Sequence, residues 1–460
     1  MDRYDTVVVG AGLCGLSAAY HLEWAGEHDW VLLERDAEVG GLARTLARDG
    51  FRFDHAIHIL YSRDPYVTDL ITTRLLPGNL GRQRRRSFCL TAGVLTEYPY
   101  QLHTFGLPAA IVRENLAGFL AAGRAADTTA PAADFETWIR RTYGPGIARH
   151  FMLPYNRRQW AWDLRDMATE WMGERVAVPT FAEVLAGALG PPGPAFGANR
   201  EFWYPLAGGI EALPRALAAE LPPERVWRGA ALAAVDAPRR ELLLADGRRV
   251  GYGRLVSTIP LPALASLLAG ALPPEIRRQA GELKHNVVHT VSLGLDGPGV
   301  GDGMHWVYVV DERAPFHRLS FPGSFSPAMV PAGCSSVQAE ISASAFRPCR
   351  RETLVRDVLQ GLVAIGLLDE RAARPRAEGG RVRVAEVVTL DPAYVIHDHG
   401  LAGRLRAIRD ALARADVVTA GRFGGWAYLN MDHAILAGRA AIAGSGAADG
   451  ARHAAEAATG

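Results

Sequence analysis

The chain contains 460 residues, 49% of them hydrophobic and 22% charged, with a formal net charge of +1. This composition is typical of a globular protein, and the length predicts two or three lobes. The near-neutral charge argues against a nucleic-acid partner, because binding to a phosphate backbone normally requires a clearly basic surface. We expect no membrane partner either, since no apolar run approaches the roughly 20 residues that span a bilayer. The densest basic run, RQRRR (Arg82–Arg86), predicts a solvated turn, with an anion contact as the alternative.

The four cysteines, Cys14, Cys89, Cys334 and Cys349, are scattered along the chain. Their spacing fits neither a disulfide framework nor a zinc site, so no metal site is expected. An apolar run begins at Thr6 and continues into a glycine-rich loop, a pattern that does not match a signal peptide. These features together predict a cytoplasmic protein.

A strand–turn–helix pattern opens the chain in YDTVVVGAGLCGLSAAYHLEWAG. The apolar run predicts a buried strand, and residues 13–25 predict a helix. Between them, Gly10-x-Gly12-x-x-Gly15 is typical of a turn that lets a pyrophosphate approach the backbone at a helix N-terminus. A second predicted strand, WVLLER, reaches Glu34, where a carboxylate that binds a ribose hydroxyl is expected.

The residues after Glu34 distinguish between dinucleotides. ERDAEVGGLARTL contains a second glycine pair and Arg44, and it resembles the FAD-binding signature of the amine-oxidase-like flavoprotein superfamily. RVWRGAALAAVDAPRRELLLADGRRVGYGRLVSTIP and ADVVTAGRFGGW resemble later parts of the same domain, which implies one FAD-binding domain assembled from three segments. The residues expected to bind the cofactor are Gly10, Gly12, Gly15, Glu34, Arg35, Gly41, Arg44, Val226, Gly421, Arg422 and Asp432.

Two insertions separate these segments. AAIVRENLAGFLAAG and FETWIRRTYGPGIARHFMLPYN have apolar residues at three- and four-residue steps and predict helices. NVVHTVSLGL, HWVYVV, FHRLSF, SSVQAEISA and RVRVAEVVTL predict antiparallel strands, with a helix near residues 352–365. The predicted fold class is α/β, a Rossmann-like FAD-binding fold with an inserted helical lobe and an inserted antiparallel β-sheet domain. The predicted division assigns 1–100, 191–260 and 396–446 to the FAD-binding domain, 101–190 to the helical lobe and 261–395 to a substrate domain.

Several segments together resemble one family, the UDP-galactopyranose mutases of the eukaryotic type. The longest is FETWIRRTYGPGIARHFMLPYNRRQWAWDLRDMATEWMGERVAVP, with a Pro-Tyr-Asn, a following Trp and a Gly-Glu-Arg-Val. EYPYQ, GANREFWYPLAGGI, APFHRLSFPGSFSP, DPAYVIHD and GRFGGWAYLNMDHAILAG resemble further segments of that family in the same order. The resemblance extends from about Tyr4 to Gly438.

This resemblance implies an enzyme that interconverts the pyranose and furanose forms of a nucleoside diphosphate sugar, UDP-galactose or a related sugar. In the family, reduced FAD is the active form, and its N5 attacks the anomeric carbon and expels the nucleoside diphosphate without net redox change. NADPH and NADH are the candidate reductants. Arginines and phenols suit such a site, because they hold a diphosphate well. The resemblance places His58, Arg175 and Arg318 at catalytic positions, and Tyr98, Gln101, Asn156, Trp160, Asn199, Tyr394 and Tyr428 at substrate-binding positions.

FDHAIHILYS (Phe53–Ser62) has the alternation of a strand and carries two histidines. A shared metal site is excluded, because side chains three residues apart on a strand point to opposite faces. The alternatives for His58 are a core position and a position beside the flavin, which the resemblance favours. Ala56 and Ile57 replace two glycines of the family, and a β-branched residue does not easily adopt positive φ. Phe325 stands where the family has a tyrosine that binds the diphosphate.

Two other functions remain as alternatives. One is an FAD-dependent oxidase or dehydrogenase of the amine-oxidase type, and the other is a flavin-binding protein without catalysis. An oxidase consumes electrons in each turnover, whereas a mutase needs only to keep its flavin reduced. The sugar, the nucleotide and the oligomeric state, including a homo-oligomer, stay open.

Overall fold

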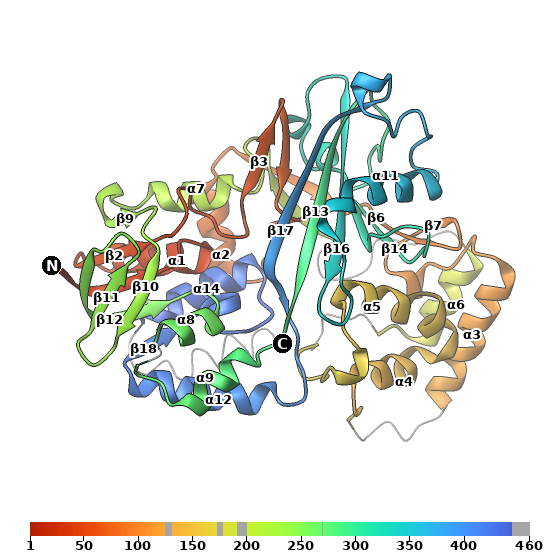
Figure 1. Cartoon of the computed structure of the whole chain (residues 1–460). Coiled ribbons are helices and arrows are strands. Elements are labelled where there is room, and N and C mark those ends of the chain that lie inside the picture. The colour runs from red at the N-terminus through yellow and green to blue at the C-terminus, as the bar shows by residue number, and fades with distance from the viewer. Residues whose placement is uncertain (125–130, 173–177, 191–199, 269, 444–460) are drawn as a thin grey trace.

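The computed structural model describes residues 1–124, 131–172, 178–190, 200–268 and 270–443. Figure 1 shows a layered strand-and-helix part that combines N-terminal, middle and C-terminal segments, beside a helical lobe and a tall second sheet. The predicted α/β fold class is therefore confirmed. Within the described ranges, no helix combines the length and the apolar character needed to cross a membrane.

The first sheet has a parallel centre of the kind predicted from the glycine-rich N-terminus. β2 and β12 flank β1 in parallel, β9 continues beyond β2, and β18 pairs in parallel with the end of β12. β10 and β11 extend the other edge as antiparallel strands. The bounds are β1 (Asp2–Val9), β2 (Trp30–Leu33), β9 (Val226–Trp227), β10 (Leu232–Asp236), β11 (Glu241–Leu244), β12 (Arg249–Ser257) and β18 (Val417–Thr419).

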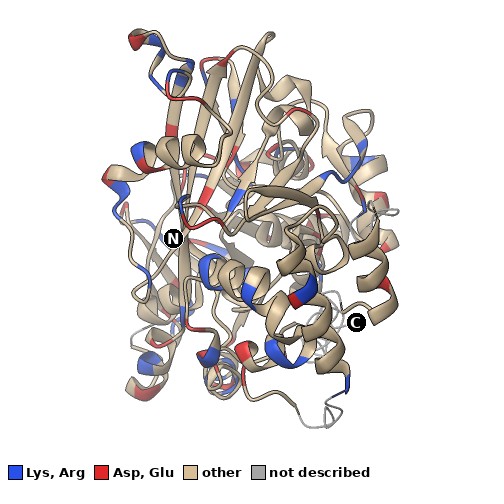
Figure 2. Ribbon diagram, turned by 90° about the vertical axis from the view of Figure 1, so that its right-hand side faces the viewer, with Lys and Arg blue, Asp and Glu red and all other residues tan. Residues whose placement is uncertain are grey.

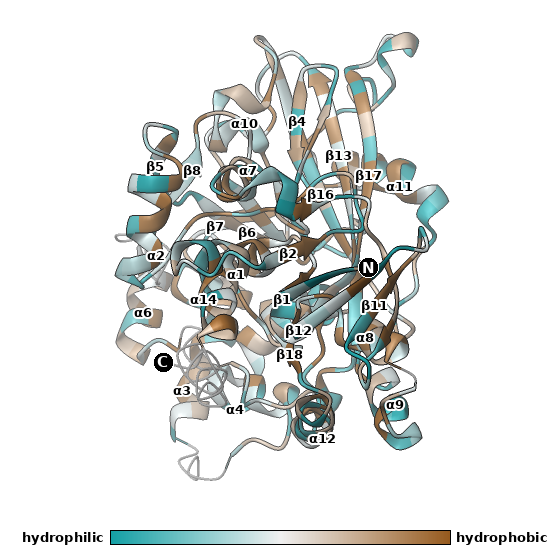
Figure 3. Ribbon diagram, turned by 90° about the vertical axis from the view of Figure 1, so that its left-hand side faces the viewer, coloured by the Kyte–Doolittle hydropathy of each residue, from teal (hydrophilic) through white to brown (hydrophobic). Residues whose placement is uncertain are grey.

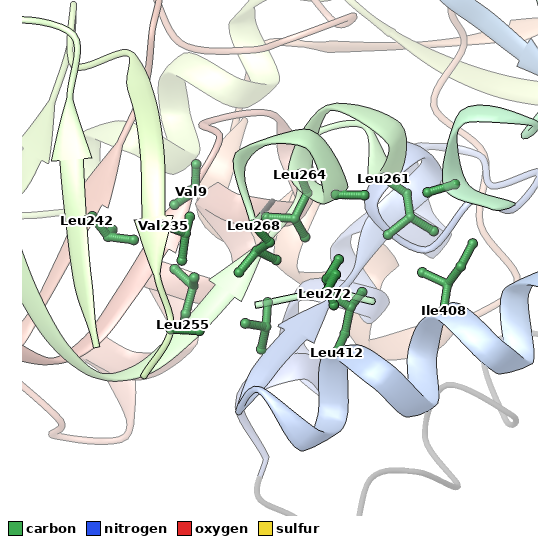
Figure 4. Close-up of a cluster of buried hydrophobic side chains, with 14 of the residues drawn as sticks. Val9, Val235, Leu242, Leu255, Leu261, Leu264, Leu268, Leu272, Ile408 and Leu412 are labelled. Atoms are coloured by element: carbon green, nitrogen blue, oxygen red, sulfur yellow. The ribbon is translucent and has the colours of Figure 1, made fainter. Parts of the chain in front are cut away.

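Helices cover both faces of this sheet, which explains why the central strands are continuously apolar. One face packs against α1 (Leu13–Trp24), α2 (Pro65–Asp69), α7 (Ala212–Ala219) and α14 (Met431–Ile442). The other packs against α8 (Leu261–Leu267), α9 (Pro274–Gly281) and α12 (Leu401–Arg414). Figure 4 shows Leu261, Leu264 and Leu268 of this second cluster beside Ile408 and Leu412. Each fully buried leucine contributes roughly 1.5–3 kcal/mol to stability.

The second sheet contains the predicted strands and two more from the N-terminal region. Its order is β17, β13, β16, β15, β14, β6 and β7. All neighbouring pairs are antiparallel except β14 and β6, which are parallel. Figure 3 shows β13, β16 and β17 side by side, with hydrophobic stretches along them. The bounds are β6 (Ser87–Thr91), β7 (Val94–Glu97), β13 (His285–Asp296), β14 (Trp306–Val309), β15 (Arg318–Ser320), β16 (Cys334–Ala343) and β17 (Val382–Val395), with α10 (Pro322–Phe325) after β15 and α11 (Leu354–Ala364) against one face.

The helical lobe forms where the three- and four-residue periodicity predicts it. It consists of α3 (Ala109–Arg124), α4 (Phe135–Ile147), α5 (Leu153–Trp160) and α6 (Phe181–Leu189). Its core is rich in aromatic side chains, among them Phe135, Tyr143 and Trp160. Charged residues of both signs are interspersed on the helices that face the viewer in Figure 2, so this face carries no single-sign field.

Packing places two segments differently from the predicted domain division. β6 and β7, inside the predicted range 1–100 of the FAD-binding domain, are strands of the second sheet because they pair with β14. α8 and α9, inside the predicted range 261–395 of the substrate domain, pack on the first sheet. Each segment packs against the sheet that buries its apolar side chains. The order of the segments along the chain does not show which sheet that is.

Two local predictions were wrong. The histidine-bearing segment is not a strand throughout: β4 (Phe51–Asp54) ends at Asp54, opposite Thr45, the first residue of β3 (Thr45–Arg48), and one further hydrogen bond follows, from the His55 N–H to the Arg44 carbonyl oxygen at 2.9 Å. Residues 55–59 therefore form a loop. The basic run is not a solvated turn, since Arg82–Arg84 lie in β5 (Leu80–Arg84), which pairs with β8 (Glu201–Pro205).

Candidate active site

The glycine-rich turn lies between β1 and α1, and its close packing leaves no room for side chains. A Cβ on Gly15 would lie 1.8 Å from the Gly10 carbonyl oxygen, and a Cβ on Gly41 would lie 3.1 Å from the Gly12 Cα. Gly41 also has a φ of +56°, which favours glycine. Gly12 gives α1 no side-chain cap, so the first N–H groups of that helix are suited to bind phosphate oxygens.

Glu34 follows β2 and is held beside this turn. Its Oε2 accepts a hydrogen bond from the Ala11 N–H at 2.7 Å, and its Oε1 accepts one from the Asp36 N–H at 2.9 Å. Val226 pairs with the end of β2 at the same edge. Arg44 forms an ion pair with Asp36 at 3.3 Å. The Arg35 side chain, in contrast, is 78% exposed at the surface.

The C-terminal segment completes this part of the site. Gly421 has a φ of +83°, and a Cβ there would lie 2.9 Å from the Cys14 Sγ in α1. Asp432 is buried in the first turn of α14. The chain thus brings together nearly all predicted cofactor residues, and they fit an FAD with its pyrophosphate at the glycine turn and a ribose hydroxyl at Glu34.

His58 lies in the loop that follows β4. Its Nδ1 is 2.8 Å from the Ala56 carbonyl oxygen, so the Nδ1–H donates and Nε2 is left as an acceptor. Burial lowers the pKa of His58 to about 4; the hydrogen bond to Ala56 opposes this shift, whereas Arg422 and Arg318 add to it. The imidazole is therefore neutral at neutral pH.

Arg318 is fixed by a buried carboxylate on the neighbouring strand. Glu340 is its direct partner in the pairing of β15 with β16, and it is 1% exposed. The Arg318 Nε donates to Oε1 at 3.0 Å and Nη2 donates to Oε2 at 2.5 Å. The Ile57 N–H also donates to Glu340 Oε1, at 3.4 Å. Glu340 therefore connects Arg318 with the His58 loop.

Two predicted phenols lie next to Arg422. The rings of Tyr394 and Tyr428 stack with 6.0 Å between centroids, and the Arg422 guanidinium is 5.0 and 5.1 Å from them. Trp160 packs against both rings, at 5.7 and 6.2 Å. Trp171 joins the group at 4.8 Å from Trp160. Trp171 was not predicted, although it lies in the mutase-like segment.

A second aromatic group surrounds Tyr98. Its ring centroid is 4.8 Å from that of Tyr308, which is 5.1 Å from that of Tyr155. Burial raises the pKa of Tyr98 to about 12 and also raises those of Tyr155 and Tyr308, so all three phenols stay protonated and can donate. Arg85, which is 6% exposed, places its guanidinium 5.0 Å from the Tyr98 ring.

The sequence reading missed Arg85, Tyr155 and Tyr308. The basic run is polar at every position, so it has no apolar alternation that could have marked Arg85 as buried.

The remaining predicted residues have different surroundings. Gln101 is buried, and the Asn156 side chain donates to the Met152 carbonyl oxygen at 2.7 Å within the helical lobe. Arg175 and Asn199 lie outside the described residues. Phe325 packs with Trp306 and Tyr204 in an apolar cluster that Ile57 also contacts. No group of three metal-ligand residues occurs in the part of the chain that the structure describes.

The fold and the glycine turn define a flavoprotein, and the comparisons agree. Residues 13–366 match the family described as flavin containing amine oxidoreductase, and the chain belongs to that family. A 50-residue segment is 54% identical to a carotenoid 3,4-desaturase of Haloarcula japonica, but it covers only 11% of this chain and 10% of that protein.

Similar solved structures include both mutases and oxidases. The crystal structure of reduced UDP-galactopyranose mutase has a TM-score of 0.89 and 27% sequence identity, and the match covers 95% of this chain and 93% of that chain. Cyclohexylamine oxidase from Brevibacterium oxydans has a TM-score of 0.66 and 16% identity, covering 98% of this chain and 99% of that one. The second likeness shows a shared fold alone.

Proposed function

We propose that this protein is a flavin-dependent mutase that interconverts the pyranose and furanose forms of a nucleoside diphosphate sugar, with UDP-galactose or a related sugar as substrate. The observation that carries the proposal is the grouping of Arg422 with the stacked Tyr394 and Tyr428, together with a fixed Arg318 beside the His58 loop. Guanidinium and phenol groups suit a diphosphate leaving group. The likeness to reduced UDP-galactopyranose mutase across 95% of the chain supports the same reading.

Each group has a distinct task in this proposal. Arg318 binds the diphosphate, and Glu340 keeps its guanidinium in one orientation. Tyr394 and Tyr428 donate hydrogen bonds to the phosphate oxygens, and Trp160 closes the site against water. Tyr98 and Gln101 bind the base, while Asn156 supports that end. Arg175 and Asn199 keep their predicted roles.

When bound in its reduced form, FAD would supply the nucleophilic nitrogen. His58 would lie beside the flavin as a neutral ring. Burial raises the pKa of Tyr98 and of Tyr394, so these two phenols stay protonated and can donate hydrogen bonds to a bound ligand. NADPH or NADH would reduce the flavin, and a cytoplasmic location would supply both. The three-part division into FAD-binding, helical and substrate regions remains part of the proposal.

A panel assay tests the reaction. The protein, reduced with dithionite under anaerobic conditions, is incubated with UDP-, GDP- and dTDP-hexoses, and the products are separated by chromatography. A new isomer of equal mass that forms only with reduced flavin supports the mutase and identifies the sugar. The absence of an isomer with every donor argues against it.

A second candidate is an FAD-dependent oxidase or dehydrogenase. It is favoured by the family match and by the fold shared with cyclohexylamine oxidase. Bleaching of the oxidised flavin by an added amine or alcohol, without any isomer from nucleotide sugars, would support this candidate.

A further inference from the structure

A small internal cavity lies next to His58, between the end of β4 and strands β8, β15 and β16. The space within it that the centre of a water molecule can occupy is about 10 Å³. Asp54, Ser320 and Gln338 provide polar groups in its wall, and Ile57 and Phe325 provide apolar ones. One water molecule needs roughly 10–15 Å³ measured in this way and two to four polar partners. The cavity therefore has the size and the polarity for one water molecule.

Asp54 is a buried carboxylate that its direct partners do not saturate. Its Oδ1 accepts from Thr45 Oγ1 at 2.8 Å and from the Ile210 N–H at 3.1 Å, and its Oδ2 accepts from Tyr204 Oη at 2.7 Å. An ionised carboxylate offers about four lone-pair sites, so one more donor can bind. Glu211 is the further charged group near this carboxylate.

His58 and Ser320 supply the other partners. The His58 Nδ1–H already donates to Ala56, so Nε2 is the ring atom left to accept. Arg318, Arg422 and His55 are the titratable groups that face this ring. Ser320 is 2% exposed on β15, and its hydroxyl can donate into the cavity that it lines. A single water that donates to Asp54 and to His58 and accepts from Ser320 makes three hydrogen bonds, the usual number for a buried water.

We propose that this cavity is a binding site for one water molecule that links Asp54 to His58, and that Asp54 is thereby a positioning residue for the histidine loop. The link does not depend on which reaction the protein catalyses. Its consequence is electrostatic: when the ring takes up a proton, the water accepts a hydrogen bond from the Nε2–H and so stabilises the imidazolium. Burial lowers the pKa of His58 to about 4, so the protonated ring depends strongly on each hydrogen-bond partner that its surroundings supply.

The test compares three proteins that carry ¹⁵N-labelled histidine. S320V adds methyl groups that fill the cavity, whereas S336V makes the same change at another buried serine, on β16, that does not line the cavity. The signal of His58 is assigned by its loss in H58Q and is then followed against pH by NMR. We expect the pKa of His58 to fall by about one unit or more in S320V and to stay at the wild-type value in S336V.

An unchanged pKa of His58 in S320V would overturn the proposal. If S320V does not fold, S320A provides a second variant, because it removes one of the three partners of the water without adding volume. A crystal structure of the unmodified protein gives an independent answer. Electron density for one water within hydrogen-bonding distance of both Asp54 and His58 supports the proposal, and well-resolved neighbouring waters without density in this cavity contradict it.

Discussion

Replacing Asp54 by asparagine should change how the stability of the protein depends on pH. Burial raises the pKa of this carboxyl from 3.8 to about 6, while hydrogen bonds from Tyr204, Thr45 and the Ile210 N–H oppose the shift. A raised pKa means that the folded state binds the proton more tightly than the unfolded state. The contribution of Asp54 to stability is therefore fully present below pH 3.8 and is lost as the pH rises to about 6.

The size of the loss follows from the shift. Roughly two pH units at 1.36 kcal/mol each give about 3 kcal/mol. D54N cannot ionise, so its free energy of unfolding should gain about 3 kcal/mol relative to the wild type between pH 4 and pH 7. D54N also loses one hydrogen bond, worth about 1 kcal/mol. This loss lowers its free energy of unfolding equally at every pH, so the slope of stability against pH does not change.

Urea unfolding at several pH values measures both effects. Y204F gives the opposite perturbation, because it removes a hydrogen bond that favours the ionised carboxylate, and it should steepen the loss of stability with pH. Parallel curves for D54N and the wild type would refute the reasoning, since they would show that Asp54 titrates alike in the folded and unfolded states.

Three further predictions concern the cofactor and substrate regions. G15A should abolish flavin binding, because its Cβ would lie 1.8 Å from the Gly10 carbonyl oxygen. Flavin binding is measured as the ratio of flavin to protein absorbance. The control variant G403A changes an exposed helical glycine with open space around it, and it should retain flavin. E340Q should lower the free energy of unfolding by about 3–5 kcal/mol in urea titrations, because Arg318 would keep a buried charge without its partner, and a loss below about 1 kcal/mol would contradict this. Y394F should weaken UDP binding about fivefold in calorimetric titrations, the value of one hydrogen bond, and unchanged affinity would remove this phenol from the diphosphate site.

The sequence predicted the regular parts of the fold well, because local periodicity determines them. The apolar run before Gly10, the helix that follows and the strands of the second sheet are all present. The placement of β6 beside β14 could not be predicted in this way, since their pairing joins segments more than 200 residues apart. The end of β4 likewise depends on where its partner strand begins, and the alternation of residues 53–62 gives no sign of it.

The candidate site was predictable where residues carry a recognisable motif. Glu34 and the glycines lie where the motif places them. Glu340 and Arg85 carry no motif of their own, because their importance comes from partners on neighbouring strands. The buried cavity beside His58 arises from four separate segments, and only the folded chain shows it.

The central claim is that the flavin stays reduced while a nucleotide sugar is isomerised. The most direct measurement reduces the bound flavin once under anaerobic conditions, adds an excess of UDP-galactose or the active sugar from the panel, and records the flavin spectrum and the product together. The account predicts many product molecules per flavin with a spectrum that is still reduced after the substrate has reached equilibrium. Product formation that stops at one molecule per flavin, with the flavin oxidised, would contradict it.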